Sequence, residues 1–203
     1  MTKTKKKKIY IGVDPDLRVL NAAIIDDDKK LHAVFVRRNK TGPGPIAVCN
    51  AARMACRLIE DVIAFLVATP ELGQHEIHLV VEDQNLQYTG KTNRATLGKL
   101  TQLCQVTGCL MGAFSNMTHE IHLVQPINWK GNVPKGIHHL RIYKDLGLEC
   151  TPAGAVNDPT QGYCVPNCLP EIVTWSHDKV NPGDFKDISD SIGLAAYGIK
   201  KGY

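Results

Sequence analysis

The sequence contains no run of about 18 consecutive apolar residues, and its first ten residues are polar and rich in lysine. A membrane-spanning helix requires such a run, and a secretory signal peptide requires an apolar stretch behind its first charges. These two absences disfavour a membrane protein and a secreted protein. We therefore expect a soluble, intracellular protein in the cytoplasm.

A disulfide framework is not expected either. The chain has 203 residues, of which 43% are hydrophobic, so it can bury one core without cross-links. Its seven cysteines are odd in number and scattered, which favours reduced thiols. A zinc site from Cys150, Cys164, Cys168 and His177 is disfavoured, because a second clear pair of ligands is lacking. We interpret residues 1–203 as a single domain.

Net charge says little about partners, since it is only +4. Its distribution says more, because residues 85–148 contain seven Lys or Arg against two acidic residues, with four histidines in the same stretch. Such a segment is a candidate surface for binding a polyanion. The alternative is an ordinary solvated basic surface.

The apolar pattern predicts a mixed α/β sheet. Behind a basic arm at residues 1–8, three strand-like runs are separated by turn residues and predict an antiparallel meander. Later strands alternate with helices, which favours additional parallel strands. The expected strands are 9–13, 19–25, 31–36, 77–81 and 121–124, and the expected helices are 46–68, 97–114, 136–146 and 187–200. Residues 149–184 are dense in proline without periodicity, so we interpret them as an irregular insertion.

Four acidic residues occupy positions suited to catalysis by metal ions. Asp14 and Glu82 each end an apolar strand, while Asp187 and Asp190 stand three apart at the start of the last helix and share one face. Singly, each acid is explained by a turn, by solvent exposure or by the helix dipole. Together they offer the converging oxygen ligands that hydrolysis of a phosphodiester with divalent cations requires.

Three motifs in order resemble the RuvC group of Holliday junction resolvases, which belong to the RNase H-like superfamily. They are Ile-Gly-Val-Asp-Pro-Asp at 11–16, Leu-Val-Val-Glu-Asp-Gln at 79–84 and Asp-Ile-Ser-Asp-Ser-Ile-Gly-Leu-Ala at 187–195. The resemblance spans nearly the whole chain except the basic arm and the insertion. It implies an RNase H-like fold and a nuclease that cuts branched DNA. Asp16 departs from the pattern, because the family usually has glycine after Asp-Pro.

By this resemblance, Asp14, Glu82, Asp187 and Asp190 hold two Mg²⁺ ions, for which Mn²⁺ can substitute, and cleavage leaves 5′ phosphates. Lys130 stands where the family has a catalytically important lysine, and Lys135 matches a second one. An ammonium group there stabilises the charge that develops on the phosphate. An ordinary surface lysine is the alternative.

The resemblance also implies contacts with DNA and a dimer. Tyr88, Lys91 and Arg94 follow Glu82, and with Lys130 and Lys135 they are candidate DNA-binding residues. The family often has an aromatic residue where this chain has Asn85, so Tyr88 is the nearest candidate for stacking on a base. A two-fold symmetric four-way junction favours a homodimer, with an interface on residues 46–68 or 93–115. A phage or otherwise divergent member is favoured, acting in a bacterial or phage-infected cell.

Other functions remain open at this point. The same fold and metals serve RNase H-like nucleases that act on flaps or on RNA–DNA hybrids. An actin-like or sugar-kinase-like ATPase shares the first motif but needs a second phosphate loop and a longer chain. The Gly-Lys-Thr at 90–92 lacks the glycine and the strand of a P-loop. A junction-binding protein without catalysis is disfavoured, because closely packed acids repel one another unless a cation neutralises them.

Overall fold

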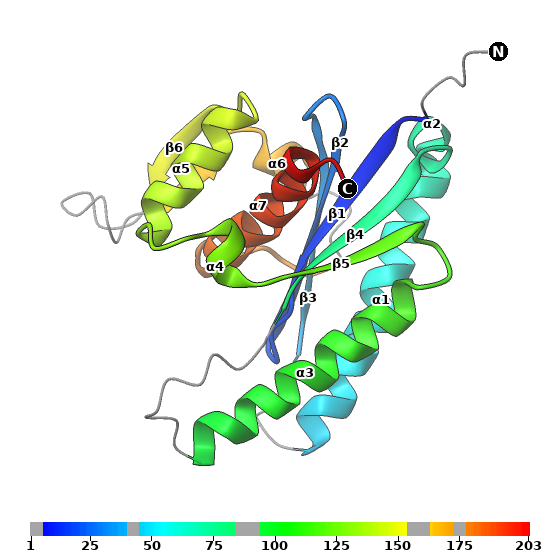
Figure 1. Ribbon diagram of the computed structural model, residues 1–203, viewed down its shortest axis with the longest axis vertical. Helices are drawn as coiled ribbons and strands as arrows, with labels where there is room; N and C mark the ends of the chain where they lie inside the picture. Colours follow the sequence, from blue (N-terminus) through cyan, green and yellow to red (C-terminus); the bar gives the residue numbers. More distant parts are fainter. Residues whose placement is uncertain (1–5, 40–44, 84–93, 154–162, 173–177) are drawn as a thin grey trace.

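The computed structural model describes residues 6–39, 45–83, 94–153, 163–172 and 178–203, and its centre is a five-stranded mixed sheet (Figure 1). The strand order is β3-β2-β1-β4-β5. The strands are β1 (Lys8–Asp14), β2 (Val19–Asp26), β3 (Leu31–Arg38), β4 (Glu76–Glu82) and β5 (Glu120–Val124). The first three strands form the expected antiparallel meander, and β1, β4 and β5 are parallel to one another. The prediction of a mixed α/β sheet is therefore confirmed.

The register of the parallel strands decides where the predicted acids lie. Val13 on β1 pairs with Val81 on β4, so the next residues along the chain are Asp14 and Glu82. Carboxyl ends of adjacent parallel strands meet at one edge of a sheet. The two acids are consequently brought side by side by hydrogen bonding between their strands.

Helices cover both faces of the sheet (Figure 1). One face is packed by α1 (Pro45–Ala68) and α3 (Arg94–Phe114), and α2 (Pro70–Gly73) follows α1 directly. The other face is packed by α7 (Phe185–Lys201), with α4 (Pro126–Trp129) and α5 (Lys135–Asp145) beside it. Side chains alternate along β1, so that Ile9, Ile11 and Val13 enter the first core, while Tyr10 enters the second. No helix in the described part of the chain is long and apolar enough to cross a membrane.

Gly12 allows α7 to lie directly on β1. A Cβ atom at position 12 would lie 2.0 Å from the carbonyl oxygen of Ser191 and 2.5 Å from the amide nitrogen of Ala195. Backbone atoms of a packed helix cannot move aside as a flexible side chain can, so this approach requires glycine. The Ser191 hydroxyl fixes the contact, because it accepts a hydrogen bond from the amide of Asp14 at 3.3 Å and donates one to the carbonyl of Asn21 at 3.0 Å.

We therefore expect Gly12→Ala to lower the free energy of unfolding by at least about 1–3 kcal/mol, because the added methyl group overpacks this contact. Gly108→Ala is the matched control, since position 108 is exposed on α3 and an added Cβ meets nothing within 4 Å. In a helix this control should gain up to about 1 kcal/mol. Urea denaturation measures both, and equal midpoints for the two variants would contradict the packing described.

The prediction of an irregular insertion at 149–184 is wrong in its described parts. They contain a two-stranded antiparallel sheet, β6 (Cys150–Ala153) with β7 (Tyr163–Pro166), then α6 (Leu169–Ile172) and a 3₁₀ turn, η1 (Pro182–Asp184). Leu169 and Ile172 are buried in the second core. The strands are only four residues long and each contains a proline, Pro152 or Pro166, which hides their pattern. The six cysteines that the structure describes are all free, as expected.

Candidate active site

The structure brings the four predicted acids together at one edge of the sheet. We call Asp14, Glu82, Asp187 and Asp190 the acidic cluster. Asp14 and Glu82 end β1 and β4, and α7 delivers the other two from its first two turns. One carboxylate oxygen each from Asp14, Asp187 and Asp190 lie within 4.8 Å of one another. Glu82 joins them through a shared lysine.

Two lysines bind the acidic cluster. The Nζ atom of Lys130 lies 2.7 Å from Oε2 of Glu82 and 3.3 Å from Oδ2 of Asp190. The Nζ atom of Lys135 lies 2.5 Å from the same oxygen of Asp190 and 3.7 Å from Oδ1 of Asp187. Lys130 follows α4, and Lys135 begins α5. The short segment between these helices therefore places both predicted lysines against the carboxylates.

His139 is a third partner of the cluster, and the sequence reasoning did not identify it. Its ring is fully buried, and Nε2 lies 2.8 Å from Oδ1 of Asp190. It lies one turn after Lys135 on α5, so the helix presents both side chains on one face. The two oxygens of Asp190 are thus held separately, one by the imidazole and the other by the two lysines. The signal in the sequence was the His-His pair at 138 and 139 within the basic segment.

The electrostatics of the cluster are strongly unequal. Burial, followed by the charges of Asp190 and Glu82, raises the pKa of Asp14 well above its ordinary value, and Lys130 opposes this only in part. Burial also acts to raise the pKa of Asp190, but the hydrogen bond with His139 and the charges of Lys130 and Lys135 outweigh it and lower that pKa to about 2. Asp190 is therefore a fixed anion, whereas the charge of Asp14 depends on further cations.

Asp187 and Lys130 complete this picture. Burial raises the pKa of Asp187, with the charge of Lys135 opposing and that of Asp190 adding to the effect. Burial acts against the charge of Lys130, but Asp190 and Glu82 attract its ammonium group and raise its pKa. Asp190 and Lys130 thus stay charged in the folded protein. Around Asp14 and Asp187, the positive charge of the protein does not fully compensate the negative charge of the carboxylates.

Comparison with known proteins identifies solved structures that have a similar fold. No protein-family model matches the sequence, and no curated protein matches it. Among solved structures, RuvC of Thermus thermophilus in complex with a Holliday junction substrate matches with a TM-score of 0.55 at 13% identity, covering 96% of each chain. The chain has a RuvC-like fold. A second Thermus thermophilus RuvC structure matches this RuvC-like fold with a TM-score of 0.52, again at 13% identity and 96% of each chain.

In this RuvC-like fold, the donor set of the acidic cluster fits hard divalent cations. Carboxylate oxygens are the ligands that Mg²⁺ prefers, and three of them already lie within 4.8 Å of one another. The raised pKa of Asp14 and of Asp187 indicates that negative charge there is not fully neutralised by the protein. A divalent cation would supply the missing charge, so the residues and their electrostatics fit such an ion.

A basic and aromatic cavity adjoins the cluster beside Lys130. Its volume is about 670 Å³, and its lining includes the cations Lys29, Arg141 and Lys200 and the rings of Trp129 and Tyr197. Lys130 lies over the Trp129 ring, 4.5 Å from its centre, and so joins the cavity to the acids. Lys29 and Lys200 lie outside the basic segment that the sequence indicated. They reach this surface because α7 and the β2–β3 turn fold beside α5.

The other predicted DNA-binding residues are only partly visible. Tyr88 and Lys91 lie outside the described residues, as does the sequence 90–92 that resembles part of a P-loop. Arg94 begins α3, and its side chain also lies outside the described part. Of the disfavoured zinc site, Cys164 is on β7 with its side chain outside the described part, and His177 lies outside the described residues.

Proposed function

We propose that this protein is a Mg²⁺-dependent endonuclease of the crossover-junction type, which nicks branched DNA and resolves Holliday junctions by paired symmetric cuts. The observation that carries the proposal is the convergence of four carboxylates and two lysines from four separate segments at the carboxyl edge of β1 and β4. The RuvC-like fold supports it, because the Thermus thermophilus RuvC structure holds a Holliday junction substrate.

The acidic cluster is the proposed site for two Mg²⁺ ions, with Mn²⁺ able to substitute. When bound, these cations supply Lewis acidity toward the phosphate and toward the attacking water, and the products carry 5′ phosphates. Asp14, Glu82, Asp187 and Asp190 are the proposed ligands. Asp190 is the best prepared of them, because its low pKa keeps it ionised and its two oxygens are already oriented by different partners.

Lys130 and Lys135 have a second proposed role toward the scissile phosphate. Both ammonium groups contact the Asp190 carboxylate, and Lys130 stays charged because its pKa is raised. With the carboxylates ligating cations, the ammonium groups of Lys130 and Lys135 would be free to face the phosphate oxygens. Fixed positive charge there stabilises the negative charge that builds up in the transition state.

His139 is proposed to act as a positioning residue through Asp190. We expect His139→Phe to raise the Mg²⁺ concentration for half-maximal cleavage by about 10–100-fold, since partners of ligands typically contribute that much. His138→Phe is the matched control, because His138 packs against Trp129 and keeps a ring there after substitution. Cleavage rates over a Mg²⁺ titration measure both variants. Identical titrations for the two variants would show that His139 has no role in holding Asp190.

The DNA path is proposed to run from the carboxyl end of β4 across the acidic cluster into the basic cavity. Tyr88, Lys91 and Arg94 follow Glu82 in the chain, and Lys29, Arg141 and Lys200 line the cavity on the other side of Lys130. Cations of this kind contact phosphates, while an aromatic ring stacks on an unpaired base. Both features suit a branch point, where the phosphate backbones of several arms converge and base stacking is interrupted.

A homodimer is part of the proposal, because a four-way junction has two equivalent strands to cut. The α1–α3 layer is the proposed interface. Ile63 and Val67 on α1 support this choice, because they are apolar and yet have exposed fractions of 44% and 75%. Burying such side chains against a second copy removes apolar surface from water.

Substrate selectivity is tested with a labelled four-way junction, a flap, an RNA–DNA hybrid and a linear duplex, each in Mg²⁺ and in EDTA. The proposal predicts Mg²⁺-dependent cutting that strongly prefers the junction. Equal cutting of flaps or hybrids would instead indicate a broader RNase H-like nuclease. Junction binding without any cutting would indicate a junction-binding protein that has no catalytic activity.

A further inference from the structure

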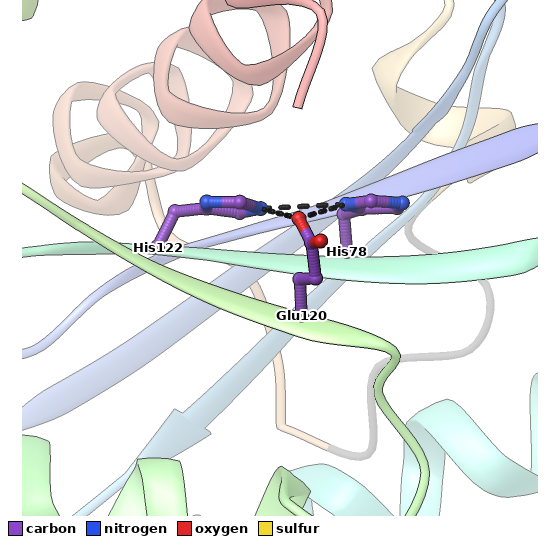
Figure 2. A group of neighbouring side chains, drawn as sticks. All are labelled: His78, Glu120 and His122. Carbon is purple, nitrogen blue, oxygen red and sulfur yellow. Dashed lines mark hydrogen bonds and ion pairs between the residues drawn. The ribbon is translucent and has the colours of Figure 1, made fainter.

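A second polar cluster lies on the same sheet, near the amino ends of β4 and β5. Figure 2 shows the imidazole rings of His78 and His122 facing each other with the Glu120 carboxylate between them. The parallel register pairs His78 with Glu120 and Val80 with His122, so the three polar side chains project from one face. We call these three residues the His-Glu-His trio.

The atoms of the trio converge on one point. Nδ1 of His78 lies 3.3 Å from Nε2 of His122. Oε2 of Glu120 lies 3.7 Å from the first nitrogen and 3.3 Å from the second. In a tetrahedral site with bonds of about 2.0–2.2 Å, neighbouring ligand atoms are about 3.3–3.6 Å apart. The three separations are therefore close to those of a zinc site with two nitrogens and one oxygen.

The surroundings hold the rings in place. His78 is almost completely buried, and its ring lies 5.5 Å from that of Tyr10. His122 stacks on the ring of Tyr203 at 3.9 Å, and the Tyr10 hydroxyl donates a hydrogen bond to the backbone oxygen of Tyr203 at 3.0 Å. Because aromatic rings on both sides fix the imidazoles, little reorganisation is needed to bind an ion.

The ligand chemistry of the trio favours a transition metal ion. The imidazole nitrogen is a common ligand of such ions, and two of these nitrogens lie 3.3 Å apart here. The trio is also chemically unlike the acidic cluster, because nitrogen ligands suit Zn²⁺ and similar ions, whereas Mg²⁺ prefers oxygen alone.

We propose that His78, Glu120 and His122 form a binding site for Zn²⁺ or a similar divalent transition metal ion, separate from the acidic cluster. Glu82 lies four positions after His78 along β4, which corresponds to about 13 Å. The site ties the edge strand β5 to β4, next to the stacked Tyr203. Glu120 is exposed, so water completes the coordination from the solvent side.

Co²⁺ is the first probe, applied to the full chain in excess Mg²⁺, which occupies oxygen-only sites. One equivalent should bind and give the visible absorption of low-coordinate Co²⁺ without the ultraviolet band of thiolate ligation. Zn²⁺ should displace it and raise the melting temperature. Glu120→Gln and His122→Phe should each weaken binding at least about tenfold, because each removes one ligand atom.

Matched variants distinguish the trio from the acidic cluster and from the cysteines as the source of a Co²⁺ signal. Glu120 is exposed and His122→Phe keeps a ring against Tyr203, so neither variant should unfold the chain, and circular dichroism checks this. His75→Phe, just before β4, should leave Co²⁺ binding unchanged. The signal should also persist in Asp14→Asn, whatever that variant shows about cleavage. Three outcomes would overturn the proposal. They are a Co²⁺ signal that persists in both Glu120→Gln and His122→Phe, an ultraviolet thiolate band, and the absence of stoichiometric Co²⁺ binding.

Discussion

Asp14→Asn is expected to abolish Mg²⁺-dependent cleavage, by at least about 10³-fold, and at the same time to raise the melting temperature of the metal-free protein at neutral pH. The loss of activity follows from losing a proposed cation ligand, whose effect is several kcal/mol in the transition state. The gain in stability follows from removing a carboxylate whose ionisation is opposed by burial and by Asp190 and Glu82.

The direction of the pH dependence follows from linkage. The folded state holds the proton of Asp14 more tightly than the unfolded state, because its folded pKa is raised. Its contribution to stability is therefore present below the ordinary carboxyl pKa and falls as pH rises through the raised pKa. In EDTA, the variant should gain most over the wild type above that raised pKa, and Mg²⁺ should stabilise the wild type more than the variant.

Thermal unfolding against pH, with and without Mg²⁺, measures these effects beside a cleavage assay. Asp28→Asn is the matched control, because Asp28 is exposed in the turn after β2 and pairs only at the surface with Lys7. It should change neither activity nor the response to Mg²⁺. Retention of cleavage by Asp14→Asn would refute its role as a ligand. An unchanged melting temperature would refute the electrostatic account of the cluster.

Lys130→Met should have the opposite effect on stability. The substitution removes the Lys130 ammonium group, which lies 2.7 Å from Oε2 of Glu82 and 3.3 Å from Oδ2 of Asp190. Both carboxylates are buried. We expect the free energy of unfolding in EDTA to fall by about 2 kcal/mol or more, because removing one member of a buried ion pair leaves charge uncompensated. Mg²⁺ should restore much of this loss, since it supplies positive charge to the same oxygens.

Cleavage by Lys130→Met should nevertheless stay reduced by about 10²–10³-fold in saturating Mg²⁺, because the charge proposed to face the phosphate is gone. Lys130→Arg keeps the positive charge and should preserve more stability than activity. Lys144→Met is the control, as Lys144 is exposed in the last turn of α5. Denaturation and single-turnover cleavage measure the variants. Full activity of Lys130→Met at saturating Mg²⁺ would remove this lysine from the mechanism.

Much of this arrangement could be predicted from the sequence, because local signals place the ends of elements. Two apolar runs stop at Asp14 and Glu82, and a periodic helix begins just before Asp187. These patterns predict that the acids lie at the ends of their strands and at the start of the helix. The mixed sheet followed from the order of strands and helices. In each case the information lies within one element and its end.

What could not be predicted depends on contacts between distant segments. His139 is 51 residues from Asp190, and the His-His pair at 138 and 139 marks it as part of the basic segment without indicating that it meets Asp190. The His-Glu-His trio requires the register of β4 against β5, since His78 and His122 are 44 residues apart. The short strands β6 and β7 carry prolines, which conceal their pairing until a partner strand is known.

Mapping the cuts on all strands of a four-way junction, at nucleotide resolution, tests the central claim most directly. The wild type in Mg²⁺ should make two symmetric nicks across the branch point, and DNA ligase should reseal them because they carry 5′ phosphates. EDTA and Asp14→Asn should each abolish both nicks. Cuts that persist in EDTA or in the variant, or products that ligase cannot seal, would contradict the account of this site.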